Sequence, residues 1–125
     1  MIAPGFAFFN REAPGVPRHL WLVLSDPAQD AERVVIANLS TKPGPDAPGC
    51  RVMPGEHPGI SRPSFLRCEH ARIVPAAQLE ALADQGLIAP TQPGSDALLR
   101  KLRAALTASL HAPQGAKAIL ERQRL

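Results

Sequence analysis

The chain has few aromatic residues and few cysteines. Its 125 residues are 4% aromatic, with one tryptophan and no tyrosine. The two cysteines, Cys50 and Cys68, belong to no CxxC motif and no Cys/His set, so the sequence contains no typical zinc site. The two can in principle pair, but the absence of other cysteines and of a secretory signal favours reduced thiols in the cytoplasm.

Long hydrophobic runs are also missing. The N-terminal stretch MIAPGFAFFNRE has no basic segment followed by a continuous apolar one, and no window approaches the length that spans a bilayer. We therefore expect a cytoplasmic protein that does not enter a membrane. The composition, 45% hydrophobic and 20% charged, is typical of a globular protein, and the length predicts a single domain over residues 1–125.

Prolines and glycines are abundant, and they separate short apolar runs. There are 14 prolines and 9 glycines. The runs that favour strands are Phe6–Phe9, His19–Ser25, Arg33–Leu39, Cys50–Met53, Ser64–Cys68 and Ala71–Val74. Short strands between turn signals, with no long helix among them, predict a mainly β fold, a small antiparallel barrel or sandwich over residues 1–75.

The pattern changes to helical spacing in residues 76–125. Residues 75–84 are good helix formers, with proline at the start and Gly86 just past the end. A second helix is expected from Ser95, with leucines at helical spacing along one face. That apolar stripe must cover either the open side of the barrel or a second subunit. The tail from Ala116 to Leu125 either forms another short helix or frays.

Three segments carry a resemblance to a known family. Residues 17–25, PRHLWLVLS, look like an Arg-Pro-x-x-Val-Leu-Ser strand with His19 in place of proline, and residues 34–41, VVIANLST, look like a third strand that ends in hydroxyl residues. Residues 64–74, SFLRCEHARIV, are similar to a strand pair that leads into the first C-terminal helix. In this order they resemble the MazF/PemK family of toxin endoribonucleases.

The resemblance implies an SH3-like barrel that forms a homodimer. It also implies cleavage of single-stranded RNA by an arginine and a hydroxyl residue without a metal or other cofactor, and inhibition by a cognate antitoxin. The stretch PGEHPGISRPSF, residues 54–65, departs from the core family and looks more like a PemK-like subgroup with a Gly-Glu-His-Pro turn.

Four residues are candidates for catalysis. Metal-free RNA cleavage needs a base, an acid and a donor to the developing phosphorane charge, roles that histidine and arginine suit. Under the resemblance Arg18 and Thr41 contact the phosphate. His57, held in a loop that prolines and glycines stiffen, is expected to move protons, with or without His19. The alternatives are a solvated arginine, a packed His19, a strand-ending Thr41 and a proline-glycine turn in which His57 caps a strand.

Five more residues are candidates for substrate binding. They are Ser40, Glu56, Ser61, Arg62 and Ser64. Ser40 competes with Thr41 for the position of the family's hydroxyl, and Glu56 can orient His57 only if both side chains turn to the same side. No ligand spacing supports a metal site. The rival hypothesis for the whole chain is a non-catalytic barrel that binds nucleic acid or a protein partner through the same loop.

Overall fold

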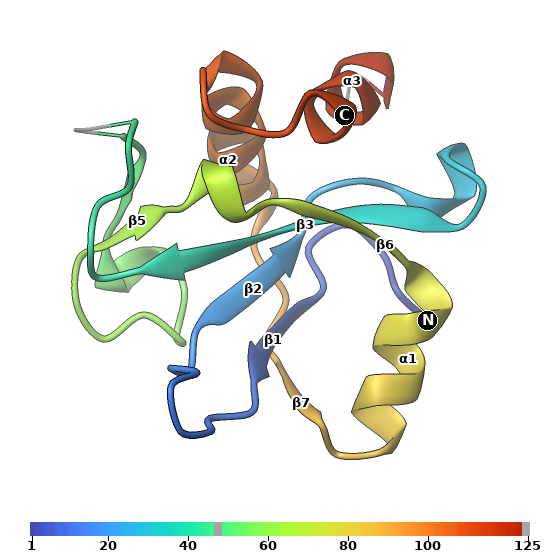
Figure 1. The fold of residues 1–125 in the computed structure, drawn as a ribbon, viewed down its shortest axis with the longest axis horizontal. Coiled ribbons are helices and arrows are strands. Elements are labelled where there is room, and N and C mark those ends of the chain that lie inside the picture. Colours follow the sequence, from blue (N-terminus) through green and yellow to red (C-terminus); the bar gives the residue numbers. More distant parts are fainter. Residues whose placement is uncertain (47–48, 124–125) are drawn as a thin grey trace.

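In the computed structural model, which describes residues 1–46 and 49–123, seven strands form a single sheet with helices on both faces (Figure 1). The strands are β1 (Ala7–Asn10), β2 (Leu20–Val23), β3 (Arg33–Ser40), β4 (Arg51–Val52), β5 (Ser64–Leu66), β6 (Arg72–Pro75) and β7 (Ile88–Thr91). The helices are α1 (Ala76–Asp84), α2 (Asp96–Ala108) and α3 (Gln114–Gln123), and short 3-10 turns occupy Pro27–Gln29, Pro54–Glu56 and Cys68–His70.

The sheet is antiparallel and open. Its strand order is β4-β5-β3-β2-β1-β7. Strand β6 lies off this path and, like β5, pairs with β3. The expected closed barrel is therefore wrong, although a mainly β chain with C-terminal helices is confirmed. Closing a barrel needs a hydrogen-bonded ladder between the two edge strands. Within the described residues, β4 is only two residues long and pairs with β5, whereas β7 pairs with β1.

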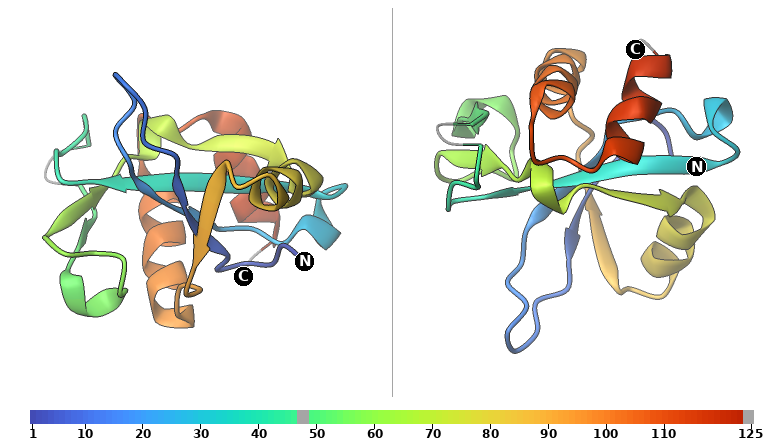
Figure 2. Two further views of the ribbon diagram at one scale, coloured as in Figure 1. Left: turned by 90° about the horizontal axis from the view of Figure 1, so that it is seen from below. Right: turned by 45° about the horizontal axis from the view of Figure 1, so that its top comes forward.

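Strand alternation gives the sheet two apolar faces. On β3, Val35, Ala37 and Leu39 belong to one core cluster, whereas Val34 and Ile36 belong to the other. Successive strand residues point to opposite faces, so a strand that is buried on both faces reads as a continuous apolar run. Helices α2 and α3 cover the first face and α1 covers the second (Figure 2).

The leucine stripe of α2 faces the sheet of its own chain. The Ser95 hydroxyl accepts a hydrogen bond from the Leu98 backbone N–H at 3.1 Å, which caps the helix as the sequence predicts. The buried residues of the stripe are Leu98, Leu99, Leu102 and Leu106. Of the two covers foreseen for the stripe, the sheet is therefore the one observed.

Strand β7 is an element that the sequence did not reveal. Ile88–Thr91 lies between α1 and α2, in the part expected to be helical, and pairs with β1 at the edge of the sheet. Pro90 weakens a strand pattern but is tolerated on an edge strand. The expected C-terminal helix is present as α3, and Arg124 and Leu125 lie outside the described residues. Of the helices in the described ranges, none has the length and apolar character needed to cross a membrane.

Candidate functional site

A cavity of about 420 Å³ lies at one end of the sheet. It brings together most of the side chains that the sequence singled out. The candidates that line it are Arg18, His19, Ser40, Thr41, Ser61, Arg62 and Ser64. None of the described residues in its lining is acidic, so the cavity carries positive charge and hydroxyl groups and suits an anionic ligand.

Strand register explains why distant segments meet in this cavity. Leu20, at the start of β2, pairs with Leu39 near the end of β3, and Leu39 pairs in turn with Leu66 of β5. Antiparallel pairing places the start of one strand beside the end of its neighbour. The residues just before β2, at the end of β3 and before β5 therefore lie at the same end of the sheet.

Arg18 is held against an aromatic ring. Its guanidinium carbon lies 4.0 Å from the centroid of Phe9, and both residues line the cavity. A cation over an aromatic face is restrained while the N–H groups at its edge stay available for an oxyanion. Phe9, which belongs to a run that the sequence predicted as a strand, therefore also positions an arginine.

The hydroxyl groups of the cavity fall into two classes. Ser40 is buried and its Oγ accepts a hydrogen bond from the Lys42 backbone N–H at 3.2 Å, and the buried Ser64 Oγ donates to the Arg62 carbonyl at 2.9 Å. Both shape the loops that form the wall. Thr41 and Ser61 are exposed. Of the neighbours Ser40 and Thr41, Thr41 is therefore the one presented to a ligand.

His57 does not line the cavity. Its side chain is buried at 3% exposure, and both ring nitrogens are bonded to the backbone. Nδ1 accepts the Gly59 N–H at 2.8 Å, and Nε2 lies 2.6 Å from the Gln92 carbonyl, which can only accept, so Nε2 carries the proton. The structure thus gives His57 a structural role, in which it joins its own turn to Gln92, rather than the expected catalytic one, and it leaves neither nitrogen free for proton transfer.

Glu56 also serves the loop rather than the cavity. Its Oε2 accepts the Met53 backbone N–H at 2.7 Å, and both carboxylate oxygens lie 3.0 Å from the Lys101 Nζ on α2. The hydrogen bond from Met53, helped by Lys101, lowers the pKa of Glu56 against the opposing effect of burial. The first half of the stretch PGEHPGISRPSF therefore anchors the loop, and its second half, from Gly59 to Ser64, forms the cavity wall.

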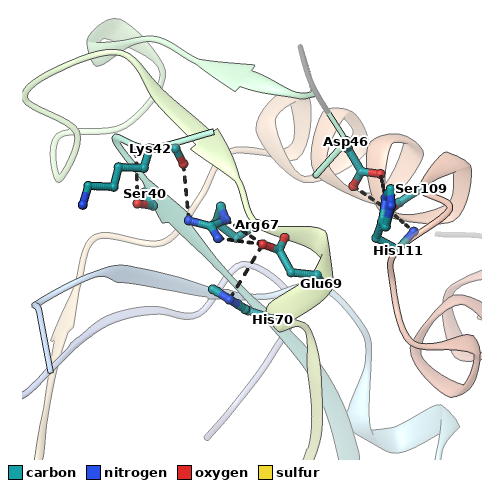
Figure 3. A network of polar contacts seen from close by, with 8 residues as sticks. All are labelled: Ser40, Lys42, Asp46, Arg67, Glu69, His70, Ser109 and His111. Atoms are coloured by element: carbon teal, nitrogen blue, oxygen red, sulfur yellow. Dashed lines mark hydrogen bonds and ion pairs between the residues drawn. The ribbon is translucent and has the colours of Figure 1, made fainter. Parts of the chain in front are cut away.

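His19 lines the cavity and is biased toward its neutral form. Burial lowers its pKa, and the positive charges of Arg67 and His70 lower it further, while a hydrogen bond to the Leu39 backbone opposes the shift. Figure 3 shows Arg67 and His70 converging on Glu69: the Arg67 Nε donates to the Glu69 Oε2 at 2.8 Å, and the His70 Nε2 lies 3.7 Å from the same oxygen. A neutral imidazole near neutrality can act as a base.

The charge of Arg67 gives a prediction about His19. We expect Arg67→Gln to raise the pKa of His19, because the substitution removes a cation that disfavours the imidazolium. An NMR titration of the histidine ring protons measures the change directly. Arg33→Gln, an exposed substitution at the start of β3, serves as the control. A His19 pKa that is unchanged or falls in Arg67→Gln contradicts the electrostatic account.

Two histidines that the sequence did not single out, His70 and His111, each contact a carboxylate in the fold. His70 approaches Glu69, as described above. The His111 Nδ1 lies 2.8 Å from the Asp46 Oδ1, and the Ser109 Oγ donates to the other oxygen of Asp46 at 2.6 Å (Figure 3). These contacts fasten the loop after β3 to the end of α2. No sequence signal links residues that are more than 60 positions apart, so only the tertiary structure reveals them.

Comparison with known proteins gives no family assignment. No protein-family model matches the chain, and no curated protein sequence matches it. Within residues 1–46 and 49–123, no group of three or more histidine, cysteine, aspartate or glutamate side chains is placed to hold a metal ion.

Proposed function

We propose that the protein is a MazF/PemK-like endoribonuclease that cleaves single-stranded RNA without a metal ion, and that the cavity at the end of the sheet is its active site. The observation that carries the proposal is the convergence of Arg18, His19, Thr41 and Arg62, from three separate segments, on one cavity. A binding module with its recognition residues on one loop has no need to gather a neutral histidine, two arginines and an exposed hydroxyl around one space.

In the proposed reaction, the RNA itself supplies the nucleophile. The neutral His19 accepts the proton of a 2′-hydroxyl, whose oxygen forms a bond to the adjacent phosphorus. The bond from phosphorus to the 5′-oxygen breaks, and the His19 imidazolium returns the proton to that leaving oxygen. The products are a 2′,3′-cyclic phosphate and a 5′-hydroxyl, so atoms and protons balance without a cofactor.

The remaining side chains stabilise charge. The phosphorane intermediate carries more negative charge than the substrate, and arginine matches phosphate oxygens with a planar fork of donors. Arg18, restrained on Phe9, and Arg62, on the anchored loop, are the donors in this proposal, and the Thr41 hydroxyl adds a third. His57 acts only through the loop that it holds. A homodimer and a cognate antitoxin are part of the same family-based proposal.

The test is cleavage of a long single-stranded RNA by the purified chain in EDTA. We expect cleavage to leave 2′,3′-cyclic phosphate and 5′-hydroxyl ends, and we expect Arg18→Ala to reduce kcat/KM about 10- to 1,000-fold because it removes one donor to the transition state. Arg11→Ala, an exposed arginine in the same loop but outside the cavity lining, is the matched control.

Two results would contradict the proposal. If natively folded wild-type protein binds the RNA but leaves it intact, the rival hypothesis of a non-catalytic nucleic-acid-binding module replaces it. If cleavage occurs but Arg18→Ala and Arg11→Ala cut as fast as the wild type, the chemistry takes place outside this cavity.

A further inference from the structure

A second cavity, of about 370 Å³, opens on the opposite face of the sheet. Its floor comes from Phe8, Trp21 and Ile36, which point to the face that α1 covers, and α1 contributes Leu79 and Leu82. The lining is mostly apolar, and none of the described residues in it is acidic. A concave apolar site of this volume with a few polar groups is of the kind that holds a small planar ligand.

The two cavities meet at the base of the β1–β2 hairpin. Pro17 and His19 line both of them. The hairpin projects from the body of the sheet (Figure 2). An extended chain that crosses Pro17 and His19 therefore meets the rim of both cavities. A ligand that places one group in the first cavity can therefore place a neighbouring group in the second.

Trp21 gives the second cavity a fixed aromatic plane. The ring is stacked on Phe8, with 6.4 Å between centroids and 5° between planes, and its Nε1 donates to the Asn10 Oδ1 at 3.2 Å. The Arg72 guanidinium carbon lies 5.8 Å from the centroid of Trp21. Proteins hold unpaired bases by stacking them on aromatic rings and on arginine planes, so this arrangement suits a nucleobase.

The polar groups of the cavity divide into structural and available ones. The side chain of Asn10 is occupied, since its Oδ1 also accepts the His19 N–H at 2.8 Å and its Nδ2 donates to the Pro17 carbonyl at 3.0 Å. Asn10 therefore builds the wall. Gln78 and Arg72 are exposed, and they offer an amide and a guanidinium to the edge of a bound base.

We propose that this second cavity binds one unpaired nucleobase of the RNA strand whose neighbouring phosphate occupies the first cavity. The inference rests on the proposed function and deepens it, because it assigns the choice of cleavage site to Trp21, Arg72 and Gln78. The base stacks on Trp21, and its edge meets Arg72 and Gln78.

Trp21 also provides the readout. It is the only tryptophan in a chain without tyrosine, so the intrinsic fluorescence reports on this cavity alone. The probe is a 2′-O-methyl RNA oligonucleotide, which has no free 2′-hydroxyl and is not cleaved. A labelled copy measures binding by anisotropy, and unlabelled copies, each with one abasic position, are titrated while the Trp21 emission is recorded.

We expect the oligonucleotide to quench Trp21 and one abasic position to abolish the quenching and weaken binding about 10-fold, the effect of losing one stacked base. In Arg72→Ala the abasic penalty should shrink, because the two changes remove parts of one interaction. Arg51→Ala is the matched control: Arg51 is an exposed strand arginine 5.6 Å from the ring of Phe65, and it lines neither cavity.

The other outcomes overturn the inference in distinguishable ways. If the oligonucleotide binds by anisotropy, or unmodified RNA is cleaved, while the Trp21 emission stays unchanged for every oligonucleotide, the base site is wrong and the proposed function stands. If Arg51→Ala alters the abasic penalty as much as Arg72→Ala does, the base site is wrong as well. If the chain neither binds the oligonucleotide nor cleaves unmodified RNA, the proposed function fails and the base site fails with it.

Discussion

His19→Ala is expected to lower the kcat of RNA cleavage about 100- to 10,000-fold, the usual contribution of a positioned general base. His19 is the only imidazole among the residues that line the cavity, so no other described histidine replaces it at the 2′-hydroxyl. Gel assays of a defined RNA substrate measure the loss. His111→Ala, an exposed histidine that contacts Asp46 away from the cavity, should cut at the wild-type rate.

The pH profile supplies a second readout for His19. Burial and the neighbouring cations lower its pKa, so the base stays deprotonated below its ordinary pKa of about 6.5. As the pH is lowered, log kcat/KM should therefore start to decrease at a pH below this ordinary pKa rather than at it. A profile that falls already above pH 7, or a His19→Ala variant that cuts as fast as His111→Ala, would show that another group accepts the proton.

His57→Ala is expected to lower the free energy of unfolding by about 2 to 4 kcal/mol, because it leaves backbone partners unsatisfied and opens a cavity. The partners are the Gly59 N–H and the Gln92 carbonyl, and Gln92 lies 35 positions from His57 in the sequence. Urea unfolding at constant pH measures the loss. His57→Asn should lose less, since an amide oxygen can still accept the Gly59 N–H.

The same two variants separate a structural role from a catalytic one. Without urea, at a temperature where both variants are folded, we expect His57→Asn to retain kcat within about 10-fold of the wild type. The ring contacts the cavity wall through the backbone N–H of Gly59, which the asparagine can still bond, and His57 itself does not line the cavity. A stable His57→Asn protein with kcat reduced as far as in His19→Ala would instead return His57 to the proton-transfer role that the sequence suggested.

Much of the local structure could be predicted from residue pattern. The β-branched run of β3 and the Ser95 cap of α2 are present as the sequence indicated. Such signals are local, since each depends on residues within a few positions of one another. Strand β7 was missed because Pro90 interrupts a four-residue strand that exists only through its pairing with β1.

The candidate site was predictable by residue type and only partly by position. Arg18 and Thr41 stand at strand ends, where side chains reach a cavity, and both line it. His57 has the side-chain chemistry of a catalytic residue but lies in the interior. A histidine between prolines and glycines can turn either inward or outward, so its position could not be predicted. Its partner Gln92 lies beyond β7, so no pattern near His57 fixes the direction.

By itself, the amino-acid sequence determined the order of six of the seven strands seen in the described residues, the first two helices and the chemical character of the side chains at strand ends, and it left the third helix open. The tertiary structure alone decided that the sheet stays open, that His19 and not His57 lines the cavity, and that Trp21 lies under a second cavity. The physical reason is the separation in sequence over which each kind of interaction acts. Propensities and caps act over a turn or a strand, whereas register, burial and the pairing of edges are set by contacts between residues far apart in the chain.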